Sequence, residues 1–259
     1  MSKPHLPAEM LDHVVDLLHD TPHALENCCL VSKSWIPRTR EHLFASVKFQ
    51  TETELESWKE RFPDPSTSPA HYAKTLIVDC SHIVTAADGN AGGWITGFSN
   101  VVHFEVGGEK MCANESGIPL RPFYGFSPVI KSLRVDFLVI LPSQVFDLIL
   151  SLPRLEDLTV IAGVSINKGD GPARSPTIVQ PPASPILTGS FPTPGAKSII
   201  RRLLSLPGGV HFRKLSVTWT QEEDPPLTMR LVEGCAHTLE ALAITSNPFR
   251  MPIRYPRVC

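Results

Sequence analysis

Residues 150–160 read Leu-Ser-Leu-Pro-Arg-Leu-Glu-Asp-Leu-Thr-Val. The stretch begins with the end of an apolar segment, which a proline closes, and continues into a run that places apolar residues at 155, 158 and 160. An apolar segment closed by proline is typical of a helix end, and a short run with alternating apolar residues is typical of a strand. The ending Leu-Ser-Leu-Pro returns at residues 204–207. The sequence therefore predicts a helix followed by a strand in more than one copy.

The strand pattern recurs along the chain as an apolar residue, two others, a large apolar residue, one other, and Val or Ile. It occurs at Ala73/Leu76/Val78, Val101/Phe104/Val106, Ile130/Leu133/Val135, Leu155/Leu158/Val160, Phe212/Leu215/Val217 and Leu239/Leu242/Ile244. The central positions are separated by 28, 29, 25, 57 and 27 residues. This spacing is at the long end of the period of leucine-rich repeats, about 20–29 residues. The interval of 57 residues is close to two periods, or to one period plus an insertion.

Helical patterns lie between several of these strands. We expect helices around residues 145–152, 199–206 and 227–237, and prolines at 153 and 207 close the first two. A helix is also expected after residue 52, where Thr53 to Glu56 have the form of a capping box, and a short strand at Val47 and Phe49 precedes it. A repeated helix–strand order predicts parallel strands stacked side by side, with helices on the outer face.

This pattern resembles degenerate leucine-rich repeats. The Asn or Cys that the family places after each strand pattern is found at only one of the six equivalent positions, Ser81, Glu109, Leu138, Gly163, Thr220 and Asn247. An irregular α/β domain with parallel strands is the alternative. If the repeats are real, a target binds the exposed strand face, at positions that include Ile77, Glu105, Arg134, Thr159, Ser216 and Ala243.

The N-terminal run from residue 6 to residue 44 has a different pattern. Leu11, Val14 and Leu18 follow the spacing of one helix face, and Met10 and Leu17 add a neighbouring stripe. A second apolar segment begins after Thr21-Pro22, which suit a helix N-cap and first position, and Pro37 opens a third. About 40 residues of helix bury too little surface to be stable alone. Such a unit needs contact with the rest of the chain or with a partner.

The N-terminal run resembles an F-box. The residues that carry the resemblance are Leu6, Pro7, Glu9, Leu11, Val14, Leu18, Leu25, Val31 and Trp35, although the segment between the first two helices is one residue longer than the commonest pattern. F-boxes bind the Skp-family adaptor of cullin–RING ubiquitin ligases. The resemblance implies adaptor contacts at Leu6, Pro7, Leu11, Val14, Leu18, Leu25, Val31 and Trp35. The alternative is an amphipathic helical hairpin that packs only on its own domain.

The expected architecture is therefore α/β, with an N-terminal three-helix F-box followed by an irregular leucine-rich-repeat-like solenoid with parallel strands. The expected divisions are an F-box at 4–48, a linker helix and loop at 49–70, a repeat-like domain at 71–247 and a tail at 248–259. Residues 164–198, with seven prolines, are expected to be a disordered insertion. The tail is a poor cap for a solenoid, so either it folds back over the last repeat or the natural array is longer.

Composition excludes several classes of function. The net charge of −2, without a basic stripe, argues against nucleic-acid binding, and no apolar run of 18 residues is present to span a membrane. The six cysteines form no C-x-x-C pair, which favours reduced cysteines and a cytoplasmic or nuclear location. No metal-binding, phosphate-binding or hydrolase motif occurs, so we expect a protein without catalytic residues, cofactors or metals.

Three functions remain at this point. The first is a substrate-receptor subunit that holds a Skp-family adaptor and, through it, a cullin ligase, together with an unknown target protein. The second is an interaction scaffold without a role in ubiquitination. The third is a hydrolase-like α/β domain with an unrecognised site. This function predicts a deep polar pocket at the carboxyl ends of the strands. Stacked repeats predict an open surface instead.

Overall fold

The computed structural model describes residues 7–80, 93–108, 120–140, 142–165, 186, 188–191, 197–206, 210–219 and 224–246. Within these ranges the chain forms one parallel sheet of eight strands and seven α-helices. The strands are β1 (Ser46–Phe49), β2 (Thr75–Asp79), β3 (His103–Gly108), β4 (Ser132–Ile140), β5 (Asp157–Ser165), β6 (Thr188–Phe191), β7 (Lys214–Trp219) and β8 (Ala241–Ser246). The helices are α1 (Ala8–Asp16), α2 (Pro22–Val31), α3 (Ile36–Leu43), α4 (Glu52–Arg61), α5 (Pro142–Leu150), α6 (Lys197–Leu204) and α7 (Asp224–Cys235).

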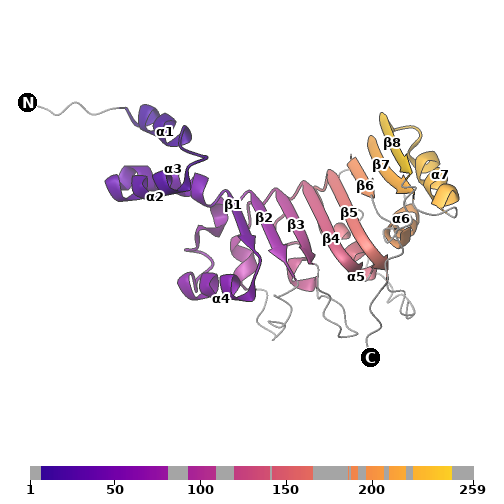
Figure 1. The fold of residues 1–259 in the computed structure, drawn as a ribbon, viewed down its shortest axis with the longest axis horizontal. Coiled ribbons are helices and arrows are strands. Elements are labelled where there is room, and N and C mark those ends of the chain that lie inside the picture. The colour runs from indigo at the N-terminus through magenta and orange to yellow at the C-terminus, as the bar shows by residue number, and fades with distance from the viewer. Residues whose placement is uncertain are drawn as a thin grey trace, which may run out of the picture.

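The strands lie side by side in their order along the chain, from β1 to β8, and every neighbouring pair is parallel. Figure 1 shows the row of strands along the long axis, with α1–α3 beyond β1 and α7 beside β8. The strand order never reverses, so each connection leads from one strand to its immediate neighbour. The predicted α/β class with stacked parallel strands is confirmed.

The predicted strand positions fall into one register. The six central apolar residues of the repeated pattern lie in one row across the sheet: Leu76, Phe104, Leu133, Leu158, Leu215 and Leu242. Val47 of β1 joins the row beside Leu76, as the expected short strand requires. The helices expected near 145–152, 199–206 and 227–237 are α5, α6 and α7. Spacing in the sequence thus predicted lateral neighbours in space.

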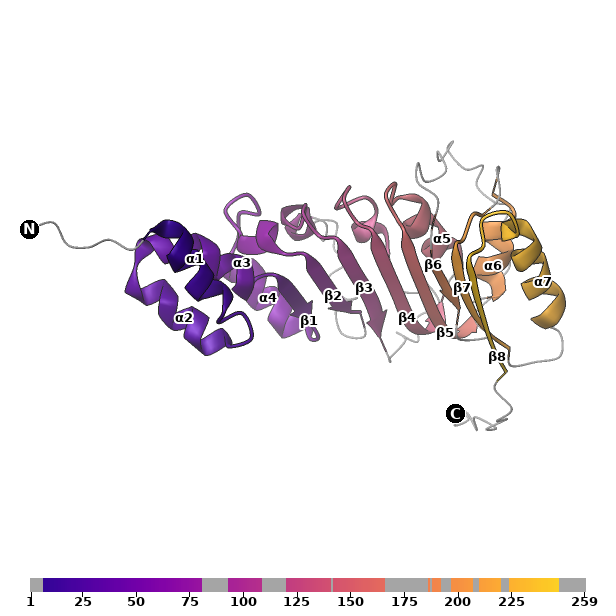
Figure 2. The same cartoon turned by 90° about the horizontal axis from the view of Figure 1, so that it is seen from above.

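The main core lies between the sheet and the helices that follow its strands. It joins core-facing strand residues such as Leu133 and Leu158 to Leu148 of α5, Ile199 of α6 and Leu231 of α7, all fully or almost fully buried. Figure 2 shows the same row of strands from above, with α5–α7 grouped along it. Burying each such side chain contributes about 1.5–3 kcal/mol, so the strand face alone accounts for much of the stability of the fold.

The prediction of a disordered insertion at 164–198 is wrong at both ends of this range. β5 continues to Ser165, β6 occupies Thr188–Phe191, and α6 begins at Lys197. The pattern search missed β6 because its central position is Gly189, not a large apolar residue. A Cβ on Gly189 would lie 2.7 Å from a ring carbon of Phe212. The ring of Phe212, which lies two residues before β7, fills the space that a side chain at 189 would otherwise take. Residues 166–185 lie outside the described residues.

The expected start of the helix after β1 is also corrected. The capping box is formed by Thr51 and Glu54, two residues before the expected pair. The Thr51 hydroxyl accepts the Glu54 N–H at 3.3 Å, and the Glu54 carboxylate accepts the Thr51 N–H at 3.3 Å. The Gln50 N–H reaches the same carboxylate at 2.6 Å, which makes Glu54 the better partner for the start of this helix.

The helix expected to be a linker packs against the sheet. Leu55 of α4 is buried, and the Trp58 ring meets Phe49 of β1 edge to face at a centroid distance of 5.6 Å. Phe98, which follows the short 3-10 helix η4 (Trp94–Gly97), completes the aromatic group at 5.7 Å from Trp58. α4 therefore belongs to the same packed body as the strands and covers the start of the sheet.

Candidate functional site

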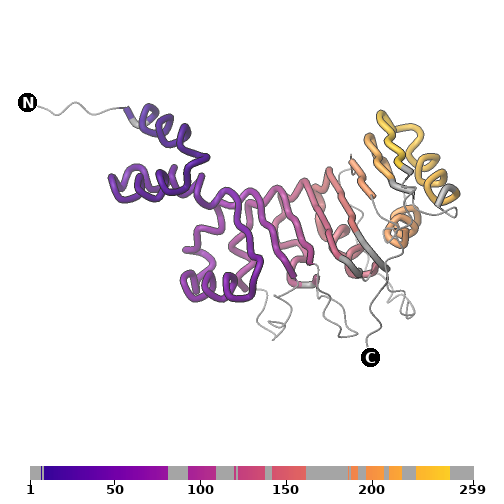
Figure 3. Tube along the Cα trace, in the orientation of Figure 1, coloured from indigo at the N-terminus to yellow at the C-terminus, as the bar shows by residue number. Residues whose placement is uncertain are grey.

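The N-terminal helices form a unit with its own small core. Val15, Leu25 and Cys28 are buried but do not join the main core of the sheet. Figure 3 shows α1–α3 projecting from the end of the sheet, joined to it through the chain that enters β1. A core of this size contributes little stability by itself. Polar contacts between the helices therefore have more influence here than in the sheet.

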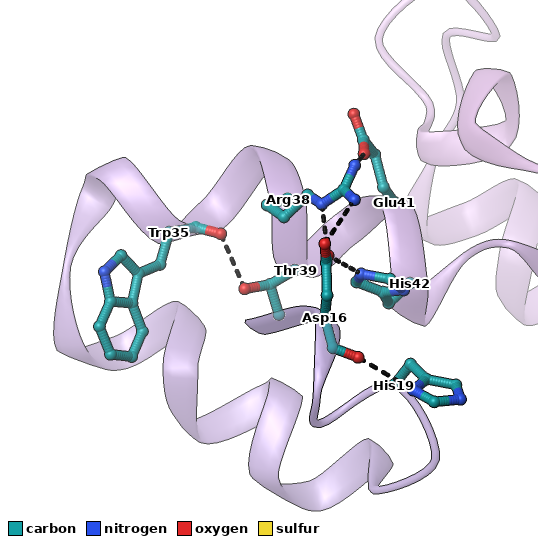
Figure 4. A network of polar contacts seen from close by, with 7 residues as sticks. All are labelled: Asp16, His19, Trp35, Arg38, Thr39, Glu41 and His42. Atoms are coloured by element: carbon teal, nitrogen blue, oxygen red, sulfur yellow. Dashed lines mark hydrogen bonds and ion pairs between the residues drawn. The ribbon is translucent and has the colours of Figure 1, made fainter. Parts of the chain in front are cut away.

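One polar cluster fastens α1 to α3. Arg38 donates from Nε to Oδ1 of Asp16 at 2.6 Å and from Nη2 to Oδ2 at 2.9 Å, and His42 Nε2 lies 2.7 Å from the same carboxylate (Figure 4). Glu41 accepts a further bond from Arg38 at 2.6 Å. Two parallel bonds between an arginine and a carboxylate restrict both position and orientation. Asp16, the last residue of α1, is therefore held against α3.

Acid should weaken this helical unit through Asp16. The hydrogen bonds from Arg38, and then that from His42, hold the pKa of Asp16 well below its usual value of about 3.9. A depressed carboxyl pKa stabilises the folded state above the unfolded pKa, and this stabilisation is lost as the pH falls through the folded pKa. Asp16→Asn should therefore lower the melting temperature of the unit at pH 7, and its difference from the wild type should shrink below about pH 4.

Thermal melts followed by circular dichroism between pH 3 and pH 7 would measure this effect. Asp12→Asn is the matched control, because Asp12 is exposed on the same helix. Equal behaviour of the two variants at every pH would contradict the fastening role of Asp16.

Large apolar side chains remain exposed on the helical unit. We call them the helical apolar surface: Met10, Val14, Leu17, Leu30 and Val31, with exposed fractions of 56, 47, 70, 85 and 68%. The first three belong to α1 or follow it directly, and the last two end α2. These five are most of the strongly exposed large apolar residues in the part of the chain that the structure describes. Exposed apolar side chains of this size make these two helices a candidate contact surface.

The structure sorts the predicted adaptor contacts into three groups. Pro7, Val14 and Val31 are exposed, and Leu11, Leu18 and Trp35 are half-buried. Leu25 is buried in the core of the unit, so its side chain supports the helices and offers no contact surface. Leu6 lies outside the described residues. Sequence reasoning did not name Met10, Leu17 and Leu30 as contacts, although each was part of an apolar stripe or segment.

The second candidate surface is the open face of the sheet. The six predicted outward positions form one row across the strands, in the order Ile77, Glu105, Arg134, Thr159, Ser216 and Ala243, and Ser190 of β6 joins the row between Thr159 and Ser216. Arg134 lies 3.4 Å from Glu105 and 3.1 Å from Asp136. Lys48 of β1 extends the row beside Ile77, so charged side chains lie at its β1, β3 and β4 positions, and small or hydroxyl side chains follow toward β8. This face offers polar contacts along its length.

The hydrolase-like alternative finds little support in this geometry. Ligands of open α/β sheets bind where the strand order reverses, and this sheet has no reversal. A cavity of about 540 Å³ lies elsewhere, between the end of α3, β1 and α4, and includes Phe44, Phe49 and Trp58 among its lining residues. In the described part of the chain, no three metal-binding side chains come together and no helix is long and apolar enough to span a membrane.

The cysteines that the structure describes are unpaired. Cys28, Cys80 and Cys235 are buried and Cys29 is half-buried, each as a free thiol. Burial raises the pKa of Cys80 to about 12. Cys80 is one of the buried side chains of the main core.

A comparison with protein-family models finds no match to this chain, and a comparison with curated proteins finds none either. The site must therefore be interpreted from its own geometry.

Proposed function

We propose that this protein is an F-box substrate-receptor subunit of a Skp–cullin–F-box ubiquitin ligase. In this proposal α1–α3 are the F-box, which binds a Skp-family adaptor, and the sheet with α4–α7 is a leucine-rich-repeat-like solenoid, which binds a target protein. A cytoplasmic or nuclear location follows from the same proposal.

The observation that carries the proposal is the helical apolar surface. Leu17, Leu30 and Val31 each expose two thirds or more of their surface on a unit that has only a small core of its own. Exposed apolar area of this kind favours association, because each buried side chain contributes about 1.5–3 kcal/mol. The residue order that resembles an F-box places Val14 and Val31 among the adaptor contacts, and both are exposed.

The mechanism is proximity. The adaptor holds the helical unit at one end of the molecule, and the target lies along the exposed sheet face. A target held in this way has a high effective concentration beside a ubiquitin-conjugating enzyme. The chain contributes no side chain to the transfer itself, and its task is to hold two partners at a defined separation.

Co-expression with a Skp-family adaptor, followed by size exclusion with mass measurement, tests the proposal. We expect the wild-type chain to elute with the adaptor. Val31→Asp should weaken the complex by roughly 30-fold or more, the effect of losing one strong interface contact of about 2 kcal/mol. The melting temperature of the Val31→Asp variant should equal that of the wild type, because the Val31 side chain is 68% exposed.

Asn27→Asp is the matched control, since it places the same carboxylate at an exposed position of the same helix. It should elute with the adaptor as the wild type does. A wild-type chain that ignores the adaptor, or a Val31→Asp variant that binds as tightly as the control, would contradict the F-box proposal. If the adaptor binds but no target is ubiquitinated in its presence, the scaffold function replaces the receptor function.

A further inference from the structure

The cavity of about 540 Å³ lies along the edge of the first strand of the sheet. β1 pairs with β2 on one side, and no strand among the described residues lies on its other side. The core-facing Val47 and Phe49 line this cavity together with the outward-facing Ser46 and Lys48. Side chains on opposite faces of a strand line the same cavity when that cavity lies beside the strand edge. Figure 2 shows α3 and α4 beside β1 at this end of the row. We call the cavity the edge groove.

The backbone of Lys48 faces the edge groove. The Ala45 carbonyl accepts the Thr75 N–H at 3.0 Å, so the backbone groups of Ala45 point toward β2. Because backbone groups of successive strand residues point to opposite sides, those of Lys48 point away from β2. The Gln50 N–H also points away from β2 and donates to Glu54 of α4. Within the described residues, the N–H and C=O of Lys48 have no backbone partner on this side, which leaves them available to an added strand.

Aromatic rings form an apolar wall of the edge groove. Phe44, Trp58 and Phe62 line it and are each half-buried. The centroid of the Trp58 ring lies 6.1 Å from that of Phe44 and 4.8 Å from that of Phe62, so the three rings pack on one another. Packed rings form a fixed surface that an apolar side chain of another molecule can cover. Such a contact removes apolar area of both molecules from water.

The charge of the edge groove is positive. Lys48 and Arg61 line it, both are exposed, and neither has an ion-pair partner within the described part of the chain. Glu54 also lines it, but its carboxylate accepts the N–H groups of Gln50 and Thr51 at the start of α4, where the helix dipole offsets a negative charge. A lysine on an edge strand disfavours pairing with most other strands. The same lysine favours a strand that brings an acidic residue beside it.

We propose that the edge groove binds an extended acidic peptide of a partner protein as a strand added beside β1. The peptide residue next to Lys48 is Asp or Glu and shares its outward face. The residues before and after it point to the opposite face, toward the aromatic wall, and are apolar or aromatic. The ligand is therefore a segment in which acidic and apolar residues alternate. This assignment does not depend on the F-box proposal, because none of the proposed adaptor contacts lines the groove.

Fluorescence polarisation with the full-length chain and the labelled peptide Ser-Glu-Phe-Glu-Leu-Glu-Ser tests the proposal. We expect saturable binding, and binding at least about tenfold weaker for Ser-Lys-Phe-Lys-Leu-Lys-Ser. Lys48→Glu should weaken binding of the acidic peptide at least about tenfold, because it places like charges side by side. Lys74→Glu is the matched control, an exposed lysine outside the groove, and should stay within about threefold of the wild type. Val31→Asp should also keep the wild-type affinity, since Val31 belongs to the helical apolar surface.

Two N-methylated forms of the acidic peptide test the strand pairing itself. One form carries methyl groups on the amides of its Glu residues and the other on those of Phe and Leu, so each loses the N–H groups of one strand side. One form should bind at least about tenfold more weakly than the other.

Several results would overturn the proposal. They are the absence of saturable binding, equal binding of the lysine peptide, equal affinities of the two methylated forms, and wild-type affinity in Lys48→Glu. A dimer in size exclusion that Lys48→Glu dissociates would show that a second copy of the chain occupies the β1 edge in place of a peptide.

Discussion

Phe212→Ala should be among the most destabilising single substitutions in this protein. The side chain of Phe212, two residues before β7, is fully buried, and its ring lies 6.0 Å from the ring of Phe191 in β6. It also fills the space over Gly189, the one central row position without a side chain. Removing a buried aromatic ring costs about 3–5 kcal/mol, because the cavity collapses only in part. Urea denaturation followed by circular dichroism would measure the loss of unfolding free energy.

A double-mutant cycle tests the reason for this effect. Gly189→Ala should destabilise the wild type by about 1–3 kcal/mol, although it brings β6 closer to the repeated pattern, because the new Cβ meets the Phe212 ring at 2.7 Å. The same change in a Phe212→Leu background should cost less, since leucine lacks the ring atoms that are in contact. If the effects of the two substitutions on the unfolding free energy are additive, contact with the Phe212 ring is not the reason that position 189 requires glycine.

Gly234→Ala is the control for this cycle. The nearest atom to a Cβ at position 234 is a Leu204 methyl carbon at 3.6 Å, an ordinary contact. Gly234 lies near the end of α7, where alanine is the better helix former, so this variant should be neutral or more stable by up to about 1 kcal/mol.

Leu25→Ala should unfold the helical unit without unfolding the sheet. Leu25 is 1% exposed and is one of three buried apolar residues in a core that is separate from the main one. The substitution costs about 2–5 kcal/mol. This cost is a large fraction of the folding free energy that so small a core contributes. Hydrogen exchange should show loss of protection in α1–α3 while β3–β5 keep theirs.

Leu30→Ala is the matched control, because it removes the same atoms from a side chain that is 85% exposed. Its effect on stability should stay within about 0.5 kcal/mol. If α1–α3 and the sheet lose protection together in Leu25→Ala, the helical unit is not an independent folding unit. In that case Leu25→Ala would weaken adaptor binding by unfolding the whole protein, and not α1–α3 alone.

The helical unit illustrates what a one-dimensional pattern leaves open. Its helices could be predicted from apolar spacing, and Pro22 does begin α2. The pattern did not distinguish Leu25, which is buried, from Leu30, which is exposed, although both belong to the same apolar segment. Burial depends on which helix lies opposite, and the position of α1 on α3 is set by Arg38 and Asp16, which are 22 residues apart.

The amino-acid sequence alone determined the row of parallel strands. Strand residues repeat at a near-constant interval, each strand pairs with the next, and Leu76, Phe104 and Leu133 therefore become lateral neighbours. Tertiary structure alone decided the exceptions. Gly189 occupies a row position because the ring of Phe212, just before β7, fills its space, and Leu242 is exposed because β8 is the end of the described row. A repeat interval is a local property of the chain, whereas the space available to a side chain depends on residues that only the folded chain brings beside it.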